Sequence, residues 1–329
     1  MEIQRRNFLH LAAGAAGLPA LPRIARAQSY PSRAITIVVP FPAGGALDVF
    51  GWILAERMRA SLAQNVIIEN IAGASGNLGA GRVARAAPDG YTLVIGYWGT
   101  HVGNGVVFAL PYDVLRDFEP IALTVTSPIL IVSKNAAPAR SLQELIEWLK
   151  ANPDKASAGT AGVGDISHVG GVLFQNRTGT RFHFVPYRGA APAAQDLVAG
   201  HIDLMLLNLT PSLPHVRAGS IKAFAVAANT RSAAAPEIPT VDQAGLPGFY
   251  VRAWLGLWAP KGTPKDVIAK LNSAVVSALA DPAVRTRLSD LGMEIFPRDQ
   301  QTPEALAAFQ KAEIEKWWPI IKAAGIKAE

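Results

Sequence analysis

The sequence predicts an α/β protein with two lobes, and three observations lead to this fold class. Apolar runs that favour β-strands alternate along the chain with segments of helical periodicity, as in α/β folds. Several of these runs are continuously apolar, which indicates strands buried on both faces in parallel sheets covered by helices. A chain of 329 residues also exceeds one typical hydrophobic core, so we expect two domains.

The first 27 residues contain the parts of an export signal in the expected order. Arg5-Arg6 opens it, a weakly apolar stretch follows, and Ala25-Arg26-Ala27 forms a small-x-small cleavage site. The paired arginines favour the twin-arginine type. The alternative, an amphipathic first helix, conflicts with the glycines and prolines of this stretch. We therefore expect cleavage near Ala27/Gln28 and a mature protein that works in the periplasm.

Composition excludes several classes of function. The formal net charge is +6, and removing residues 1–27 takes away four arginines and one glutamate, which leaves +3. The basic residues form no runs, so we expect no nucleic-acid partner, whereas a slight positive field suits small anions. Cysteine is absent and the histidines lack metal-binding spacing, so we expect no disulfide, no metal and no cofactor.

Ten strands are expected in the mature chain. Their residue ranges are 34–39, 66–69, 92–95, 121–125, 129–133, 156–159, 182–185, 204–207, 221–226 and 251–258. A helix follows the first strand, because one stripe at helical spacing is formed by Leu47, Phe50, Leu54, Met58 and Leu62.

Capping signals mark further helices. Ser141 and Glu144 form a capping box that opens a helix to about residue 150. Residues 264–279 and 282–291 are helical, and Thr302-Pro303 opens a last helix that stops at Gly325. The last 70 or so residues hold no strand long enough for a sheet of their own, so they must pack on an earlier sheet.

These elements suggest how the chain divides. We predict one lobe from residues 28–126 plus 251–329 and a second from 127–250, joined by two chain crossings. Ligand loops in such folds lie at the carboxyl ends of strands.

A glycine-rich loop follows the first strand. Gly44 and Gly45 let backbone amides turn inward where the helix begins, and unpaired amides at a helix N-terminus form an anion site. We therefore name Phe41, Ala43, Gly44 and Gly45 as ligand-binding residues. Asp48 either caps this helix or contacts the ligand, and capping is favoured because a carboxylate repels an anionic ligand.

A second glycine-rich loop spans residues 159–168 and also joins a strand to a helix. It offers a second set of backbone donors, so a ligand could be held at both ends. The alternative is a flexible turn without a ligand. Neither loop has a nucleotide-binding signature. The candidate residues of this loop are Thr160, Gly162, Val163, Gly164, Ser167 and His168.

A third segment, residues 96–101, follows another strand. Tyr97 and Trp98 stand beside two glycines, which suggests a loop lining a cleft. An apolar wall there would favour an aromatic or long-chain acid. Thr100 and His101 complete this candidate set, although a helix-capping or indirect role is equally open to both His101 and His168.

Short motifs along the mature chain resemble the extracytoplasmic solute receptors of tripartite tricarboxylate transporters, also called the Bordetella uptake gene family. The resemblance covers essentially the whole mature chain, and its strength lies in the order of the motifs. They include Val39-Pro40-Phe41-Pro42-Ala43-Gly44-Gly45, Ala87-Pro88-Asp89-Gly90-Tyr91, Leu110-Pro111-Tyr112-Asp113, Val185-Pro186-Tyr187-Arg188-Gly189 and Gly245-Leu246-Pro247-Gly248.

The resemblance implies a periplasmic-binding-protein (Venus flytrap) fold, a small carboxylate between two lobes, and delivery to the permease subunits of a membrane transporter. It also implies that residues 41–48 hold one carboxylate, partly through ordered waters, while residues 160–168 set much of the specificity. We add Tyr187, Leu207 and Asn208 to the candidate ligand-binding residues.

The chain departs from the family pattern at two positions that bear on the ligand. Leu47 stands where relatives commonly carry Ser or Thr, and Leu207 where many carry a polar residue. These changes favour a larger or more apolar mono- or dicarboxylate, aromatic acids included, over citrate.

We expect the receptor to be a monomer. Two other functions are alternatives to solute binding for transport. An exported hydrolase acting on a carboxylate-bearing substrate would need Ser167 or Ser75 as nucleophile and His168 or His101 as base. Adjacent residues on one helix point about 100° apart, so Ser167 and His168 do not form such a pair, and we expect no enzyme. A receptor for a sensor system is the other alternative, and the sequence does not separate it from a transport receptor.

Overall fold

The structure, a computed structural model, describes residues 30–327. The predicted export signal and its cleavage site lie outside these residues. From Arg33 onward the chain forms one compact unit. Within the described residues no single helix is both long and apolar enough to cross a membrane. One bent pair, Lys265–Ala280 with Pro282–Asp290 at 70°, reaches that length only when the two are joined.

Ten strands form one sheet in the described chain. They are β1 (Ile35–Val39), β2 (Val66–Asn70), β3 (Thr92–Tyr97), β4 (Phe118–Lys134), β5 (Ser157–Thr160), β6 (His183–Pro186), β7 (Leu204–Asn208), β8 (Ile221–Val226), β9 (Arg252–Pro260) and β10 (Glu294–Ile295). The order is β2-β1-β3-β9-β4-β7-β5-β6, and β8 and β10 also pair with β4. β1 is parallel to β2 and β3, and β5 is parallel to β6 and β7, which confirms the parallel pairing predicted from the apolar runs.

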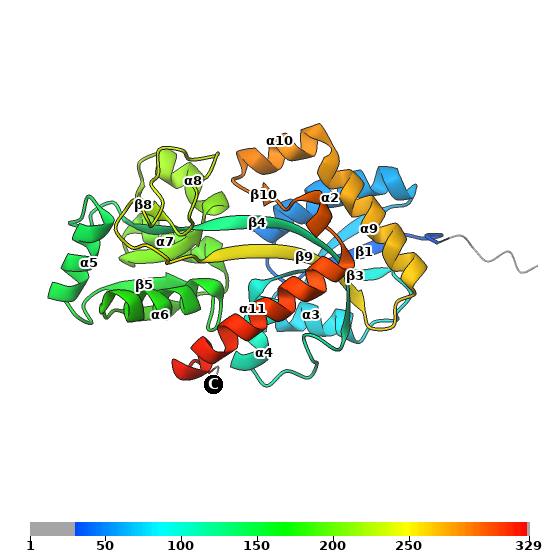
Figure 1. The fold of residues 1–329 in the computed structure, drawn as a ribbon, viewed down its shortest axis with the longest axis horizontal. Coiled ribbons are helices and arrows are strands. Elements are labelled where there is room, and N and C mark those ends of the chain that lie inside the picture. The colour runs from blue at the N-terminus through cyan, green and yellow to red at the C-terminus, as the bar shows by residue number, and fades with distance from the viewer. Residues whose placement is uncertain (1–29, 328–329) are drawn as a thin grey trace, which may run out of the picture. The chain divides into compact units, whose positions relative to one another are not determined.

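Strand β4 connects two halves of this sheet. Its residues 118–128 pair antiparallel with β9, and its residues 129–134 pair with β7 and β8. We call β1, β2, β3, β9 and β10 with the start of β4 the first half-sheet, and β5 to β8 with the end of β4 the second half-sheet. Figure 1 shows β4 and β9 running side by side between the two groups of elements.

The prediction of two separate strands at 121–125 and 129–133 was wrong, because β4 is one strand of 17 residues. Pro128 does not interrupt it. This residue forms the last pair with β9, opposite Arg252, and the next residue, Ile129, already pairs with Asn208 of β7. The missing N–H of Pro128 therefore falls where the strand changes partners.

Ten α-helices surround the sheet in the described chain. They are α2 (Ala46–Leu62), α3 (Asn77–Ala84), α4 (Asn104–Val107), α5 (Leu142–Ala151), α6 (Ile166–Thr178), α7 (Ala190–Ala199), α8 (Leu209–Arg217), α9 (Lys265–Ala280), α10 (Pro282–Asp290) and α11 (Pro303–Ala323). Short helical turns are η1 (Ala74–Gly76), η2 (Gly99–Gly103) and η3 (Arg298–Gln300). In Figure 1, α5 to α8 gather around the second half-sheet, and α2, α3 and α9 around the first.

Helix α2 covers the first half-sheet with the stripe that the sequence predicts. Phe50, Leu54, Met58 and Leu62 are buried, and full burial of such a side chain contributes roughly 1.5–3 kcal/mol. The first residue of the stripe, Leu47, is only half-buried. Its position at the start of the helix leaves it at the edge of the core, beside a pocket.

The C-terminal helices pack on a sheet formed earlier in the chain, as predicted. α9 contacts α2 and β4, and α11 contacts β4. Buried Gln310 on α11 donates to the carbonyl of His101 at 2.8 Å and accepts a bond from the Trp258 indole at 3.3 Å. The Thr302 hydroxyl caps α11 by accepting from the Ala305 amide at 3.1 Å. Residues near both ends of the chain therefore form one side of the molecule.

Candidate functional site

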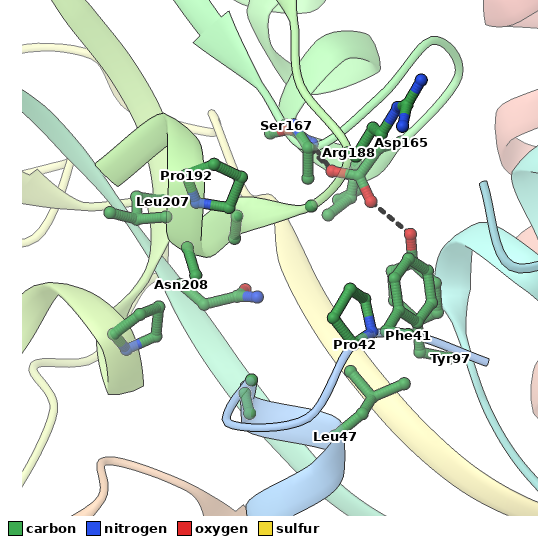
Figure 2. Close-up of a pocket in the computed structure, with 18 of the residues that line it drawn as sticks. Phe41, Pro42, Leu47, Tyr97, Asp165, Ser167, Arg188, Pro192, Leu207 and Asn208 are labelled. Carbon is green, nitrogen blue, oxygen red and sulfur yellow. Dashed lines mark hydrogen bonds between the residues drawn. The ribbon is translucent and has the colours of Figure 1, made fainter. Parts of the chain in front are cut away.

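A pocket of about 130 Å³ lies beside β4 where the two half-sheets meet (Figure 2). Residues from the first half-sheet side form one wall, and residues from three helices of the second half-sheet side form the others. The lining consists of Phe41, Pro42, Ala43, Gly44, Gly45, Ala46, Leu47, Tyr97, Ile129, Ala161, Asp165, Ile166, Ser167, Arg188, Gly189, Ala190, Ala191, Pro192, Met205, Leu206, Leu207, Asn208 and Pro211.

Four helices begin at this pocket. Their N-cap residues are Gly45 for α2, Asp165 for α6, Gly189 for α7 and Asn208 for α8, and all four residues line it. The first amides of a helix have no acceptor within the helix, and each helix carries roughly half a positive charge at this end. Helix ends of this kind can bind an anion through their unpaired amides.

The first wall is held in shape by Asp48. Its Oδ2 accepts from the Gly44 amide at 2.8 Å, and its Oδ1 accepts from the Asn70 side chain at 2.9 Å. The same Asn70 amide group donates to the carbonyl of Phe41 at 3.1 Å. Asp48 is buried and does not line the pocket. It therefore stabilises the 41–45 loop locally, and the Gly44 amide is already occupied.

The second glycine-rich loop is stabilised by its own side chains. Asp165 Oδ1 accepts from the Ser167 amide at 2.9 Å and from the Ser167 hydroxyl at 2.6 Å. That hydroxyl accepts in turn from the Ala161 amide at 2.9 Å, and His168 Nδ1 accepts from the Gly164 amide at 3.1 Å. Several amides expected to face a ligand are therefore already bonded within the loop.

One buried hydrogen bond joins the two walls. The Tyr97 hydroxyl, at the end of β3, donates to Asp165 Oδ2, at the start of α6 (Figure 2). Burial, together with the neighbouring Asp165 carboxylate, raises the pKa of Tyr97 well above its usual value. Tyr97 therefore stays protonated and remains a donor. Its ring also makes an edge-to-face contact with Phe41, with centroids 5.2 Å apart.

Polar side chains are few in the lining. Asp165 is buried, whereas Arg188 is exposed. Asn208 points into the pocket in Figure 2, and within residues 30–327 its buried Oδ1 has no hydrogen-bond partner. A ligand could supply that missing donor. The rest of the lining is largely apolar, with Leu47, Ile129 and Leu207 among its members.

A second cavity, of about 210 Å³, lies beside α5 and offers less to a ligand. Its charged side chains, Lys134 and Asp203, bond to each other at 2.7 Å. The four helix ends are at the first pocket, so we assign the candidate site there. No group of three or more His, Asp or Glu side chains in the described residues is arranged to hold a metal ion.

The structure places some predicted site residues in the pocket lining and others elsewhere. Those in the lining are Phe41, Ala43, Gly44, Gly45, Tyr97, Ser167, Leu207 and Asn208. Those outside it are Asp48, Trp98, Thr100, His101, Thr160, Gly162, Val163, Gly164, His168 and Tyr187.

The core of the first half-sheet side contains Trp98, Thr100 and His101, and these three residues are fully buried. The aromatic wall of the pocket consists instead of Phe41 and Tyr97. The His101 ring stacks on Trp258 with centroids 3.9 Å apart, and its Nδ1 lies 2.9 Å from the Thr100 hydroxyl. Burial lowers the pKa of His101 to about 3, so the ring is neutral at physiological pH.

The tip of the second loop faces the first half-sheet side instead of the pocket. A Cβ on Gly103 would lie 2.8 Å from the carbonyl oxygen of Gly164, and a Cβ on Gly164 would lie 2.8 Å from Val107. Gly162 adopts φ +146°, and a Cβ there would lie 3.1 Å from the hydroxyl oxygen of Ser75. These glycines allow the backbones of the two sides to approach closely.

The remaining residues outside the lining have local partners. The Tyr187 hydroxyl donates to Asp196 Oδ2 at 2.6 Å. The His168 ring makes an edge-to-face contact with Phe184, and burial lowers its pKa. The bond from the Gly164 amide to His168 Nδ1 requires that nitrogen to be unprotonated. The hydroxyl of Ser167 is instead bonded to Asp165 and Ala161, so Ser167 and His168 do not form a nucleophile–base pair.

Sequence reasoning named Asn208 as a site residue but did not predict the helices α7 and α8, and it missed both charged side chains of the lining. A signal was available at Gly189, where a glycine precedes a helix with Pro192 in its first turn. Asn208, an N-cap residue type, likewise follows an apolar strand. Nothing local in the sequence indicates that these two ends meet Gly45 at one pocket, because the convergence depends on the folded sheet.

The family of the chain is given by a match to the model of the tripartite tricarboxylate transporter family receptor, over residues 52–326. Three solved structures share its fold. MatC from Rhodopseudomonas palustris, solved with bound malate, is 39% identical, with 89% of this chain and 100% of that chain covered and a TM-score of 0.84. The periplasmic binding protein BugD is 38% identical, with 91% and 100% covered and a TM-score of 0.85.

The third structure, an R. palustris protein solved with adipate, is 33% identical, with 91% of this chain and 99% of that chain covered and a TM-score of 0.86. These likenesses confirm the periplasmic-binding-protein fold with two α/β lobes. The chain therefore belongs to the tripartite tricarboxylate transporter receptor family, whose members are solute-binding receptors and not enzymes.

Proposed function

We propose that this receptor captures a small carboxylate in the pocket between its lobes. The observation that carries the proposal is the convergence of four helix N-termini on one largely apolar pocket. Such ends attract and bind a carboxylate through backbone amides, without a dedicated cation. The malate and adipate bound by two similar proteins support the same ligand class.

The ligand's carboxylate and its carbon skeleton meet different parts of the pocket. The amides of Ala190 and Ala191 in the first turn of α7, beside the start of α8, are the proposed donors. Phe41, Tyr97 and the leucines of the lining would bury the carbon skeleton. The side-chain amide of Asn208 offers a further polar contact.

The proposed lobes are residues 28–126 plus 251–329 and residues 127–250. β4 and β9 carry the chain between them, and the pocket is lined from both sides. Closure about these strands would exclude water from the ligand, which strengthens each hydrogen bond to its carboxylate. We propose that the protein works as a monomer in the periplasm after removal of residues 1–27.

A thermal-shift experiment tests the ligand class. Protein freed of bound molecules by unfolding and refolding would be titrated with butyrate, succinate, benzoate and citrate, and with butyramide and benzamide as uncharged controls. Ligand at about 100 times its Kd stabilises a protein by about 2.7 kcal/mol, which corresponds to roughly 5–10 °C in Tm. We expect at least one acid other than citrate to reach this shift and neither amide to do so.

Native mass spectrometry would establish that the refolded protein is empty before the titration. If no carboxylate in the panel raises the Tm of the empty, folded protein, the proposed ligand class is wrong. If citrate alone raises the Tm, the inference that the apolar lining favours less charged acids is wrong.

We propose further that the receptor delivers its ligand to the membrane permease of a tripartite transporter. The family match supports this partner. Deleting the receptor gene should abolish uptake of the radiolabelled acid by intact cells, and supplying the gene on a plasmid should restore it. Unchanged uptake together with a lost transcriptional response to the acid would instead indicate a receptor for a sensor system.

A further inference from the structure

An acidic side chain lines a pocket that otherwise suits anions. Asp165 is only 6% exposed, and its carboxylate belongs to the lining. Among residues 30–327, Asp165 and Arg188 are the only charged side chains of the lining. Arg188 is exposed, so solvent screens its charge, whereas the charge of Asp165 acts in a water-poor environment.

Asp165 also occupies the start of α6. Its Oδ1 bonds to the amide and hydroxyl of Ser167, and its Oδ2 bonds to the hydroxyl of Tyr97. Both carboxylate oxygens of Asp165 therefore accept hydrogen bonds from the chain itself. The positive end of α6 is offset by its own cap, and the hydroxyl donors of Tyr97 and Ser167 at this corner of the pocket are already bonded to Asp165.

The other helix ends are not equivalent. Asp48 in the first turn of α2 offsets that end in the same way, although it lies outside the lining. The ends of α7 and α8 have no acidic residue in their first turns. With roughly half a positive charge at each end, these two uncompensated helices together match about one negative charge.

We propose, on the basis of the proposed function, that Asp165 restricts the ligand to a single negative charge. The pocket takes a monocarboxylate, whose carboxylate faces the ends of α7 and α8. The opposite end of the ligand, near Asp165 and Tyr97, carries an apolar group or a hydrogen-bond donor such as a hydroxyl. A second carboxylate there would face the buried Asp165 charge and be repelled.

Calorimetric titration with acids matched in length tests this specificity. The pairs are butyrate with succinate and hexanoate with adipate, each measured on the wild type and on Asp165→Asn. The asparagine keeps the shape of the side chain and an acceptor for Ser167 but removes the charge. We expect the wild type to prefer the monoacid of at least one pair by about tenfold or more, and Asp165→Asn to reduce that ratio by about tenfold.

Two further variants separate charge from structure. Asp165→Ser also removes the charge and retains an N-cap side chain, so it replaces Asp165→Asn if that variant folds poorly. Tyr97→Phe removes the bond to Asp165 but leaves the carboxylate, so it should keep the preference for monoacids. Circular dichroism and Tm would establish that each variant is folded.

The outcomes are distinguishable. A wild type that binds diacids as tightly as the matched monoacids overturns this inference and leaves the proposed function intact. Equal weakening of both acids in Asp165→Asn, with an unchanged ratio, also overturns it and assigns Asp165 a structural role. If neither monoacids nor diacids bind the wild type, the proposed function itself fails.

Discussion

At the scale of single residues, two of the predicted site residues have structural roles outside the pocket lining. The sequence predicts His101 as a site residue, but its ring is stacked on Trp258 in the core. The sequence left open whether Asp48 caps the helix or contacts the ligand. Its hydrogen bonds to Gly44 and Asn70 stabilise the 41–45 loop. The residue types were informative, but their direction depends on neighbours distant in sequence, such as Asn70 and Trp258.

The buried His101 should make the protein sensitive to acid. Its pKa is about 3 in the folded chain, against about 6.5 when unfolded, so only the unfolded chain takes up a proton as the pH falls below 6.5. Its contribution to the free energy of unfolding is therefore constant above pH 6.5 and is lost progressively toward pH 3. Between pH 7 and 4.5 this loss amounts to about 2 kcal/mol.

Replacing His101 by glutamine should remove this part of the acid sensitivity. Guanidinium unfolding at pH 7 and pH 4.5 would measure it: the variant is expected to lose about 2 kcal/mol less than the wild type between the two conditions. His201→Gln is the matched control, because the His201 side chain is 70% exposed. Equal losses in the wild type and His101→Gln would show that His101 titrates normally in the folded protein.

At the scale of elements, capping signals were the most reliable part of the sequence prediction. Ser141 accepts from the Glu144 amide at 3.2 Å, as the capping box predicts, although the Glu144 carboxylate reaches the amide of Arg140 and not that of Ser141. Helices α7 and α8 were missed because no side chain caps their starts, whereas the equally short α5 and α10 begin at the capping residues Ser141 and Asp281.

The turn η2 and the second glycine-rich loop form a close contact between the two sides of the molecule. Gly103→Ala should therefore oppose the approach of these sides, since the new methyl group would lie 2.8 Å from the Gly164 carbonyl oxygen and 2.8 Å from Trp98. We expect ligand affinity to fall by about tenfold, equivalent to about 1.4 kcal/mol, in calorimetric titration with whichever acid binds the wild type.

Gly105→Ala provides the control for that experiment. Its methyl group would also crowd a tryptophan, Trp318 at 2.9 Å, but it would not approach the second loop. Both variants should lose some thermal stability, whereas only Gly103→Ala should weaken binding. Equal effects of the two substitutions on affinity would indicate that the contact at Gly164 does not matter for closure.

At the scale of the whole molecule, the fold class followed from the sequence, and the pocket followed only in part. Continuous apolar runs such as 204–207 coincide with strands, and β7 spans Leu204–Asn208. The pocket instead combines Gly45, Asp165, Gly189 and Asn208, which are far apart along the chain. Local patterns can identify each helix start, but only the sheet order brings the four together.

The continuity of β4 has a consequence for how this protein can change over evolutionary time. Residues 125–128 pair without interruption with β9, and residue 129 passes directly to β7. Successive side chains of a strand point to opposite faces of the sheet. Inserting or deleting one residue here would therefore move the side chains of the adjoining stretch of strand to the opposite face. Residues 125–131, which lie between two register shifts of β4, therefore share one alternation of inward and outward side chains across the junction of the half-sheets. Length variation among descendants should be confined to the surface loops, while this stretch changes only by substitution.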